Sequence, residues 1–185
     1  MTAIEVEAAE RSLLARLRNA EPGRRLVYFL DPKDRPLHGL AGLVDFDSGG
    51  RLSRLLRDPA LFSGRDGEAV LLRLDVPGLR DPTLLAGLGA WGEPGEAGRL
   101  AHAWVERIVA LGGGRILLGL PAGPRHAGGR LAFAEALACA IRAAAAGDER
   151  PRTWTFVVES AEVVRLSSRL QGPLRAAGAP PATPS

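Results

Sequence analysis

Two apolar runs close together in the chain constrain its fold more than any other feature. The segment Gly64–Gly89 contains apolar runs at Ala69–Leu74 and Thr83–Leu88, and a turn sequence with two prolines and a glycine separates them. Proline and glycine interrupt regular structure, and short apolar runs bounded in this way are typical of strands buried on at least one face. We therefore predict a pair of core strands at the centre of the protein.

Helices and strands are predicted to alternate along the rest of the chain. Apolar spacing predicts a helix over residues 5–20, a strand at Leu26–Leu30 and a helix around Gly50–Arg57. Farther on, the same criteria predict helices at 99–111, 131–146 and 161–170, and strands at 115–120 and 153–158. Strands that alternate with helices imply a sheet covered on both faces. The expected fold class is α/β, a three-layer α/β/α domain with a mixed, largely parallel sheet.

Chain length and composition predict one domain. A chain of 185 residues can bury a full-sized core, and we place a single domain at residues 1–171. Residues 172–185 are rich in proline and alanine and have few side chains to bury, which predicts a disordered tail or linker. Because no apolar run approaches the ~20 residues of a membrane span and the N-terminus lacks a signal-peptide core, we expect a cytoplasmic protein without membrane contact.

No residue cluster predicts a metal site or a cofactor. The three histidines, His38, His102 and His126, are far apart in the sequence, whereas zinc ligands are usually closely spaced. A Gly-x-Gly sequence at Gly87 follows a predicted strand, as in phosphate-binding loops. The glutamates Glu93 and Glu96 lie just after it and would repel a phosphate. We expect no metal, no cofactor and no dinucleotide site.

The segment Pro121–Arg130 is the best candidate for an anion-binding loop. It follows a predicted strand, precedes a predicted helix and supplies five candidate ligand residues, namely Arg125, His126, Gly128, Gly129 and Arg130. Backbone amides at a helix N-terminus and guanidinium groups both favour a bound phosphate. The alternative is a surface loop that only connects strand to helix.

A second candidate is a basic helix face. Arg51, Arg54 and Arg57 recur every three residues and would share one side of the predicted helix. This face could contact DNA, with an affinity that falls steeply as salt rises. The alternative is a solvated face opposite the buried leucines of the same helix.

The segment Asp45–Gly89 resembles the N-terminal domain of the leucyl aminopeptidase family. The matching pieces are Asp45, Gly50–Ser53, the sequence FSGRDGE at Phe62–Glu68, and Leu84–Gly89. The resemblance implies a macro-like fold whose roles are to pack against a catalytic domain, to support an oligomer and, in some members, to contact DNA. The metal-binding catalytic domain of that family has no counterpart in these 185 residues. We therefore expect that the chain is not an enzyme, with a macro-type hydrolase as the remaining alternative.

Three hypotheses about function follow. The first is a non-catalytic interaction or regulatory module that mediates oligomerisation or binds a protein partner. The second is a binding domain for a nucleotide or an ADP-ribose-type phosphate ligand, which macro domains imply, with the 121–130 loop as its site. Macro domains also use an asparagine-rich strand end, and the single asparagine here, Asn19, falls in the first predicted helix. The third hypothesis is DNA binding through the arginine helix face.

Overall fold

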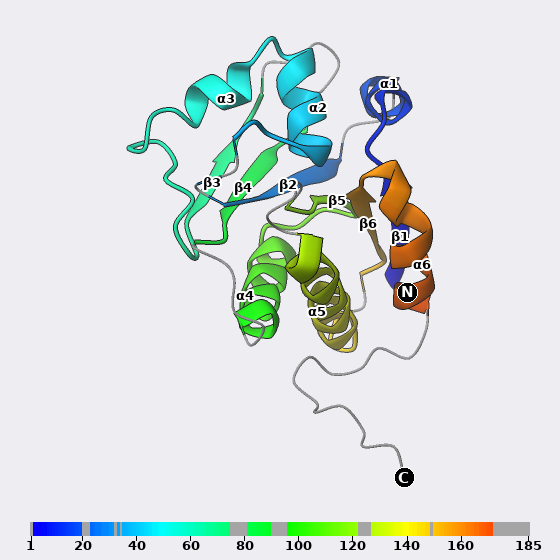
Figure 1. Ribbon diagram of the computed structural model, residues 1–185. Coiled ribbons are helices and arrows are strands. Elements are labelled where there is room, and N and C mark those ends of the chain that lie inside the picture. Colours follow the sequence, from blue (N-terminus) through cyan, green and yellow to red (C-terminus); the bar gives the residue numbers. More distant parts are fainter. Residues whose placement is uncertain are drawn as a thin grey trace.

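A six-stranded sheet lies between two layers of helices in the computed structural model (Figure 1). The structure describes residues 2–19, 23–31, 33, 35–74, 81–89, 96–121, 127–148 and 150–171, with the backbone only at 127, 128 and 171. The strands are β1 (Thr2–Ala8), β2 (Arg24–Leu30), β3 (Ala69–Leu72), β4 (Thr83–Gly87), β5 (Arg115–Gly119) and β6 (Arg152–Val158). The helices are α1 (Arg11–Asn19), α2 (Gly39–Asp47), α3 (Arg51–Leu55), α4 (Glu96–Ala110), α5 (Ala127–Ala145) and α6 (Val163–Gln171), with a 3₁₀ turn, η2, at Ser160–Glu162.

The sheet is mixed and largely parallel. Its strand order is β1-β6-β5-β2-β4-β3, and all neighbouring pairs of these strands run parallel except β3 and β4, which are antiparallel. Helices α1, α2 and α3 cover one face, and α4, α5 and α6 cover the other (Figure 1). This arrangement confirms the predicted three-layer α/β/α fold. In the described part of the chain, none of the helices has the length and apolar content needed to cross a membrane. The predicted tail, 172–185, lies outside the described residues.

Strand β2 contributes to both apolar cores because its side chains alternate between the two faces of the sheet. Val27 and Phe29 face the core under α4, α5 and α6, where the Phe29 ring packs edge-on against Trp104 and Phe133 at centroid distances of 6.3 and 5.1 Å. Tyr28 faces the opposite core under α1, α2 and α3. With both faces covered, β2 is the central strand that positions the loops at its end.

The predicted helix over residues 5–20 is wrong in its first half. Residues 2–8 form β1, which pairs in parallel with β6, and helix α1 starts only at Arg11. Ile4 and Val6 pack against the core and alternate with Glu5 and Glu7, which is the period of a strand. The helical prediction rested on the apolar spacing over residues 5–20 as a whole, and so it missed the alternation in the first part of that segment.

The predicted pair of core strands is confirmed for only one of its members. Every residue of β4 is buried, whereas β3 lies at the edge of the sheet and is partly exposed. The centre of the sheet is formed by β2 and β5 instead. An apolar run of four to six residues cannot by itself distinguish an edge strand from a central one, because the difference lies in which strands pair.

Helix α2 was not predicted, since Gly39 and Gly42 interrupt its apolar run. The structure shows why glycine is needed at the second position. A Cβ atom on residue 42 would lie 2.5 Å from the carbonyl oxygen of Leu37, a distance that side chains do not tolerate. Gly42 therefore allows the segment before the helix to pack closely against its first turn.

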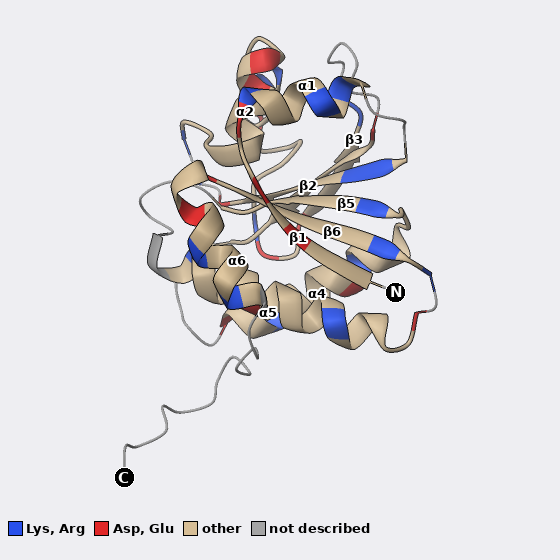
Figure 2. Ribbon diagram, turned by 90° about the vertical axis from the view of Figure 1, so that its right-hand side faces the viewer, with Lys and Arg blue, Asp and Glu red and all other residues tan. Residues whose placement is uncertain are grey.

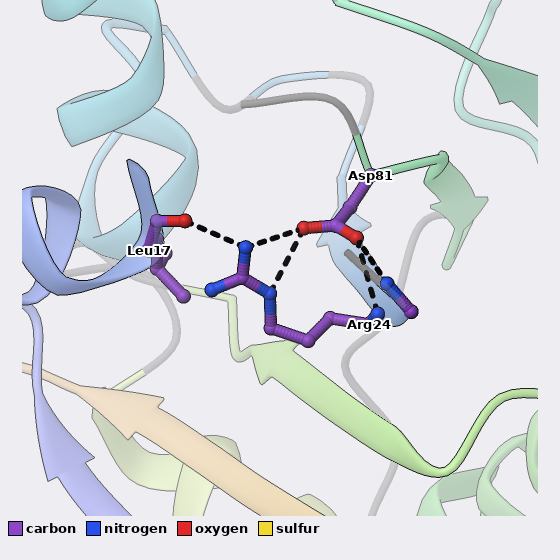
Figure 3. Close-up of polar contacts among 4 residues, drawn as sticks. Leu17, Arg24 and Asp81 are labelled. Carbon is purple, nitrogen blue, oxygen red and sulfur yellow. Dashed lines mark hydrogen bonds and ion pairs between the residues drawn. The ribbon is translucent and has the colours of Figure 1, made fainter. Parts of the chain in front are cut away.

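A buried ion pair joins three elements at the amino end of the sheet (Figure 3). The Asp81 carboxylate accepts hydrogen bonds from the backbone N–H groups of Gly23 and Arg24 and from Nε of Arg24, and the Arg24 guanidinium lies 2.7 Å from it. The same guanidinium donates to the Leu17 carbonyl of α1 at 2.6 Å. The contacts connect α1, the start of β2 and the residues before β4. Basic residues also begin β5 and β6 (Figure 2).

Candidate ligand-binding site

In open α/β sheets, ligands bind at the carboxyl ends of the parallel strands. After β2 the chain continues to α2 on one face, and after β5 it continues to α5 on the opposite face. Where neighbouring strands lead to opposite faces, their loops diverge and leave a crevice, and ligands of open α/β sheets bind there. The described residues at this edge include Asp31 after β2 and Pro121 after β5.

A cavity of about 210 Å³ opens at the carboxyl end of β2. Its lining residues are Leu30, Asp31, Arg35, Leu56, Arg57, Pro59, Phe62, Ser63 and Gly64. Asp31 is only 7% exposed and accepts a hydrogen bond from the backbone N–H of Lys33 at 2.7 Å. Arg35 donates to the Leu56 carbonyl at 3.0 Å, and Arg57 is exposed at the rim. The cavity thus combines one carboxylate, two guanidinium groups and an apolar wall.

The turn beside this cavity is held by the carboxylate of Glu68. It accepts hydrogen bonds from the backbone and the hydroxyl of Ser63 and from the backbone of Arg65, at 2.7–3.0 Å. Desolvation acts to raise the pKa of Glu68, but the hydrogen bonds from Ser63, Arg65 and Gly64 outweigh it and hold that pKa below its usual value. This is the structural role of the FSGRDGE sequence.

The glycines of the Gly-x-Gly sequence contact this turn. Gly87 exchanges backbone hydrogen bonds with Gly67 and Glu68, and Gly89 donates to the Gly64 carbonyl. A Cβ atom on residue 87 would lie 2.2 Å from the carbonyl oxygen of Arg65. Close approach of two backbone segments therefore requires glycine at position 87, independently of any phosphate.

The predicted anion loop is shorter than expected, because helix α5 begins at Ala127. Gly128, Gly129 and Arg130 belong to its first turn, and Arg125 and His126 lie outside the described residues. Arg130 is 6% exposed; its Nε donates to the Pro121 carbonyl at 2.6 Å and its guanidinium pairs with Glu162 at 2.5 Å. Arg130 thus joins the start of α5 to η2, and a ligand role for these five residues stays a prediction.

The arginine helix face is exposed. Arg51, Arg54 and Arg57 are all solvent-accessible, although α3 ends at Leu55 and Arg57 follows it. Of the three, Arg57 lines the cavity at the end of β2. DNA binding through this face stays a prediction, and the structure adds that one of its arginines borders a possible small-ligand site.

Sequence reasoning missed most of the cavity residues. Asp31 could have been found, because a polar residue directly after a buried strand lies at the carboxyl edge of a parallel sheet. Arg35 and Phe62 carried no such signal, since the path of the chain after β2 and α3 brings them together. Among the described residues, no group of three or more His, Cys, Asp or Glu side chains could hold a metal ion.

Comparison with known proteins supports a macro-like fold. No family model matches the sequence, and no curated protein matches it in sequence. A tomato leucine aminopeptidase mutant superposes on this chain with a TM-score of 0.60 and 16% sequence identity. The match covers 92% of this chain but only 35% of the aminopeptidase, so this chain spans about a third of the length of that protein. An Oceanobacillus iheyensis macrodomain mutant superposes with a TM-score of 0.58 and 13% sequence identity, and the match covers 91% of this chain and 89% of the macrodomain chain. A poly(ADP-ribose) glycohydrolase mutant from Thermomonospora curvata superposes with a TM-score of 0.51 and 19% sequence identity, and the match covers 91% of this chain and 79% of the glycohydrolase chain.

These similarities define the class of protein as a macro-like α/β domain and correct one expectation. The leucyl aminopeptidase resemblance holds as a distant match of fold. The expectation that the chain is not an enzyme, which we based chiefly on the missing peptidase domain, is contradicted by this comparison. A protein named as a glycohydrolase shares this fold over 79% of its own chain. The lack of a peptidase domain therefore does not exclude catalysis.

Proposed function

We propose that this chain binds a small phosphate-containing ligand of the ADP-ribose type at the carboxyl edge of its sheet. The observation that supports this proposal most is the cavity at the end of β2, where the buried Asp31 lies with Arg35 and Arg57. The macrodomain and the poly(ADP-ribose) glycohydrolase with the same fold make a ligand of this chemistry the natural candidate. Ligand binding therefore ranks above a pure interaction module.

The residues of the cavity suit the parts of such a ligand. A guanidinium group such as that of Arg57 can donate two parallel hydrogen bonds to a phosphate. A carboxylate such as that of Asp31 only accepts hydrogen bonds, and so it selects a ribose hydroxyl or an amino group. Phe62 and Pro59 offer an apolar wall against a sugar or a base.

The size of the cavity indicates that it holds part of the ligand. Its volume of about 210 Å³ is smaller than the roughly 300–1,000 Å³ of typical small-molecule sites. In our proposal the rest of the ligand extends past Pro121 toward the start of α5. The N-terminus of this 19-residue helix would favour a second phosphate through the N–H groups of its first turn and its dipole.

Isothermal titration calorimetry with ADP-ribose tests the proposal, with ADP and ribose 5-phosphate as partial ligands. Arg57→Ala removes an exposed arginine that lines the cavity, and Arg54→Ala is its matched control on the same segment. Loss of a charge-assisted hydrogen bond should cost about 1.5–3 kcal/mol, or roughly 10- to 100-fold in affinity. The control variant should bind like the wild type.

Two results would overturn the proposal. One is the absence of binding heat with all three ligands for a protein whose circular dichroism spectrum shows it to be folded. The other is equal affinity of wild type, Arg57→Ala and Asp31→Asn, which would place any bound ligand away from this cavity. An effect of Arg125→Ala would in addition bring the predicted 121–130 loop into the site.

A further inference from the structure

The two edges of the sheet differ in charge. Edge strand β1 carries Glu5 and Glu7. Charged residues of this kind prevent an edge strand from pairing with another chain. Edge strand β3, with the sequence AVLL, carries no charge, and its Leu71 side chain is 50% exposed. Of the two edges, only that of β3 lacks this protection.

The hydrogen bonds of β3 show which of its backbone groups are available. The backbone N–H of Gly87 donates to the Glu68 carbonyl, and β3 continues from there in antiparallel pairing with β4. In an antiparallel ladder, alternate residues direct their N–H and C=O groups to the same neighbour. Val70 and Leu72 therefore bond to β4, while the backbone groups of Ala69 and Leu71 point outward. Within the described ranges these outward groups have no backbone partner.

We propose that β3 pairs with the β3 strand of a second copy of this chain, antiparallel across a two-fold axis. In this arrangement outward-facing residues meet each other, and we place the two-fold axis at the exposed Leu71, opposite Leu71 of the partner subunit. Ala69 would lie opposite Arg73 of the partner subunit, and its small side chain leaves room for the guanidinium group. The two sheets become one continuous sheet through a self-complementary contact.

Charge selects a second copy as the occupant of this edge. The strand itself is uncharged, so two copies can approach without the repulsion that Glu5 and Glu7 would cause between two β1 edges. The exposed residues of β3 itself, Ala69 and Leu71, are apolar. The exposed Arg73 that follows the strand would lie opposite Ala69 of the partner subunit, so the two arginines do not face each other across the two-fold axis. None of the four β3 residues lines the ligand cavity, so this proposal is independent of the proposed function.

Sedimentation equilibrium on the full chain tests this inference. The wild type, with a chain mass of 19.5 kDa, should have the mass of a dimer, and Leu71→Lys should have that of a monomer. Leu61→Lys is the matched control, since Leu61 is a leucine of similar exposure, 54%, outside the strand. The control should remain dimeric. Ala69→Pro, which removes an outward N–H group and leaves Leu71 in place, should also be monomeric.

The outcomes separate clearly. A wild type that stays monomeric over the whole concentration range would overturn the inference. So would a dimer that survives both Leu71→Lys and Ala69→Pro, because its contact would then lie elsewhere. Loss of the dimer in Leu61→Lys as well would indicate a broader apolar contact and would equally contradict pairing through β3. Thermal unfolding of each variant by circular dichroism verifies that it is folded.

Discussion

Breaking the ion pair of Arg24 and Asp81 should cost far more stability than its distance alone implies. Its two side chains are 6% and 1% exposed, and the nearest nitrogen and oxygen atoms are 2.7 Å apart. The exposed pair of Arg99 and Asp66 has nearly the same distance, 2.8 Å, with side chains that are 59% and 47% exposed. The two pairs differ mainly in burial, and so one can serve as the control for the other.

Arg24→Met should lower the free energy of unfolding by about 3–5 kcal/mol, because it leaves the buried Asp81 carboxylate without its cation. In a chain of this length the melting temperature would fall by roughly 10 °C. Arg99→Met should cost far less than Arg24→Met, since water screens an exposed pair. Urea unfolding followed by the fluorescence of the buried Trp104 and Trp154 measures both changes.

A double-mutant cycle separates the ion pair from its other contacts. Asp81→Asn removes the charge and keeps an oxygen that can accept from the backbone N–H groups of Gly23 and Arg24. The double variant Arg24→Met/Asp81→Asn leaves no unpaired buried charge and should be more stable than the Arg24→Met variant. Equal losses for Arg24→Met and Arg99→Met, or additive losses in the double variant, would refute this reasoning.

The remaining predictions concern single residues and the arginine face. Glu68 has a lowered pKa in the folded state, so its stabilisation is present above the unfolded-state pKa and is lost as the pH falls through the folded-state value. Glu68→Gln should therefore lower the free energy of unfolding by about 1 kcal/mol near neutral pH after allowance for solvent screening. In strong acid, urea unfolding should show no difference in stability between this variant and the wild type. The hydroxyl of Tyr28 is buried without a hydrogen-bond partner among the described residues, so calorimetry of Tyr28→Phe should show unchanged or slightly higher stability; a large loss would reveal a hidden partner. Gly87→Ala should destabilise by about 1–3 kcal/mol through its contact with the Arg65 carbonyl, whereas Gly98→Ala, with open space in helix α4, should gain up to about 1 kcal/mol. If the arginine face binds DNA, fluorescence anisotropy should show an affinity that falls steeply with salt and weakens when alanine replaces Arg51, Arg54 and Arg57; binding that ignores salt would contradict this role.

The fold class could be predicted because local patterns determine it. Short apolar runs ended by glycine or proline marked the strands at 26–30, 83–88, 115–120 and 153–158, and each is present in the sheet. Strand–helix alternation then required two covered faces. Strand order could not be predicted in the same way, because it depends on pairings between distant segments, and for this reason β3 was expected in the core.

The two errors in the helix predictions have physical causes. The alternation of Ile4 and Val6 with Glu5 and Glu7 fits a strand, but short segments of this kind also satisfy a loose helical pattern. Helix α2 was missed because its glycines argue against a helix unless a neighbouring backbone needs the space, as the Leu37 carbonyl does at Gly42. Close approaches of this kind between backbone segments arise only in the folded chain, and so the sequence does not reveal them.

The candidate site was only partly predictable. Sequence reasoning identified Arg57 as part of a basic face and Arg130 as an anion ligand. The structure places Arg57 at a cavity and uses Arg130 to join α5 to η2. The chemistry of a guanidinium group is the same in both settings, and burial and partners decide its role. The carboxyl end of β2 could be expected to carry a site, whereas the approach of Arg35 and Phe62 to Asp31 follows from the path of two loops.

The most direct test of the central claim is a nuclear magnetic resonance titration of the ¹⁵N-labelled chain with ADP-ribose. Binding at the carboxyl end of β2 predicts saturable shifts of the backbone amides of Asp31, Ser63 and Gly64. The amides of Thr2 and Ile4, in a separate groove under β1, should stay unchanged. Shifts confined to that groove, or no shifts at saturating ADP-ribose, would contradict the account.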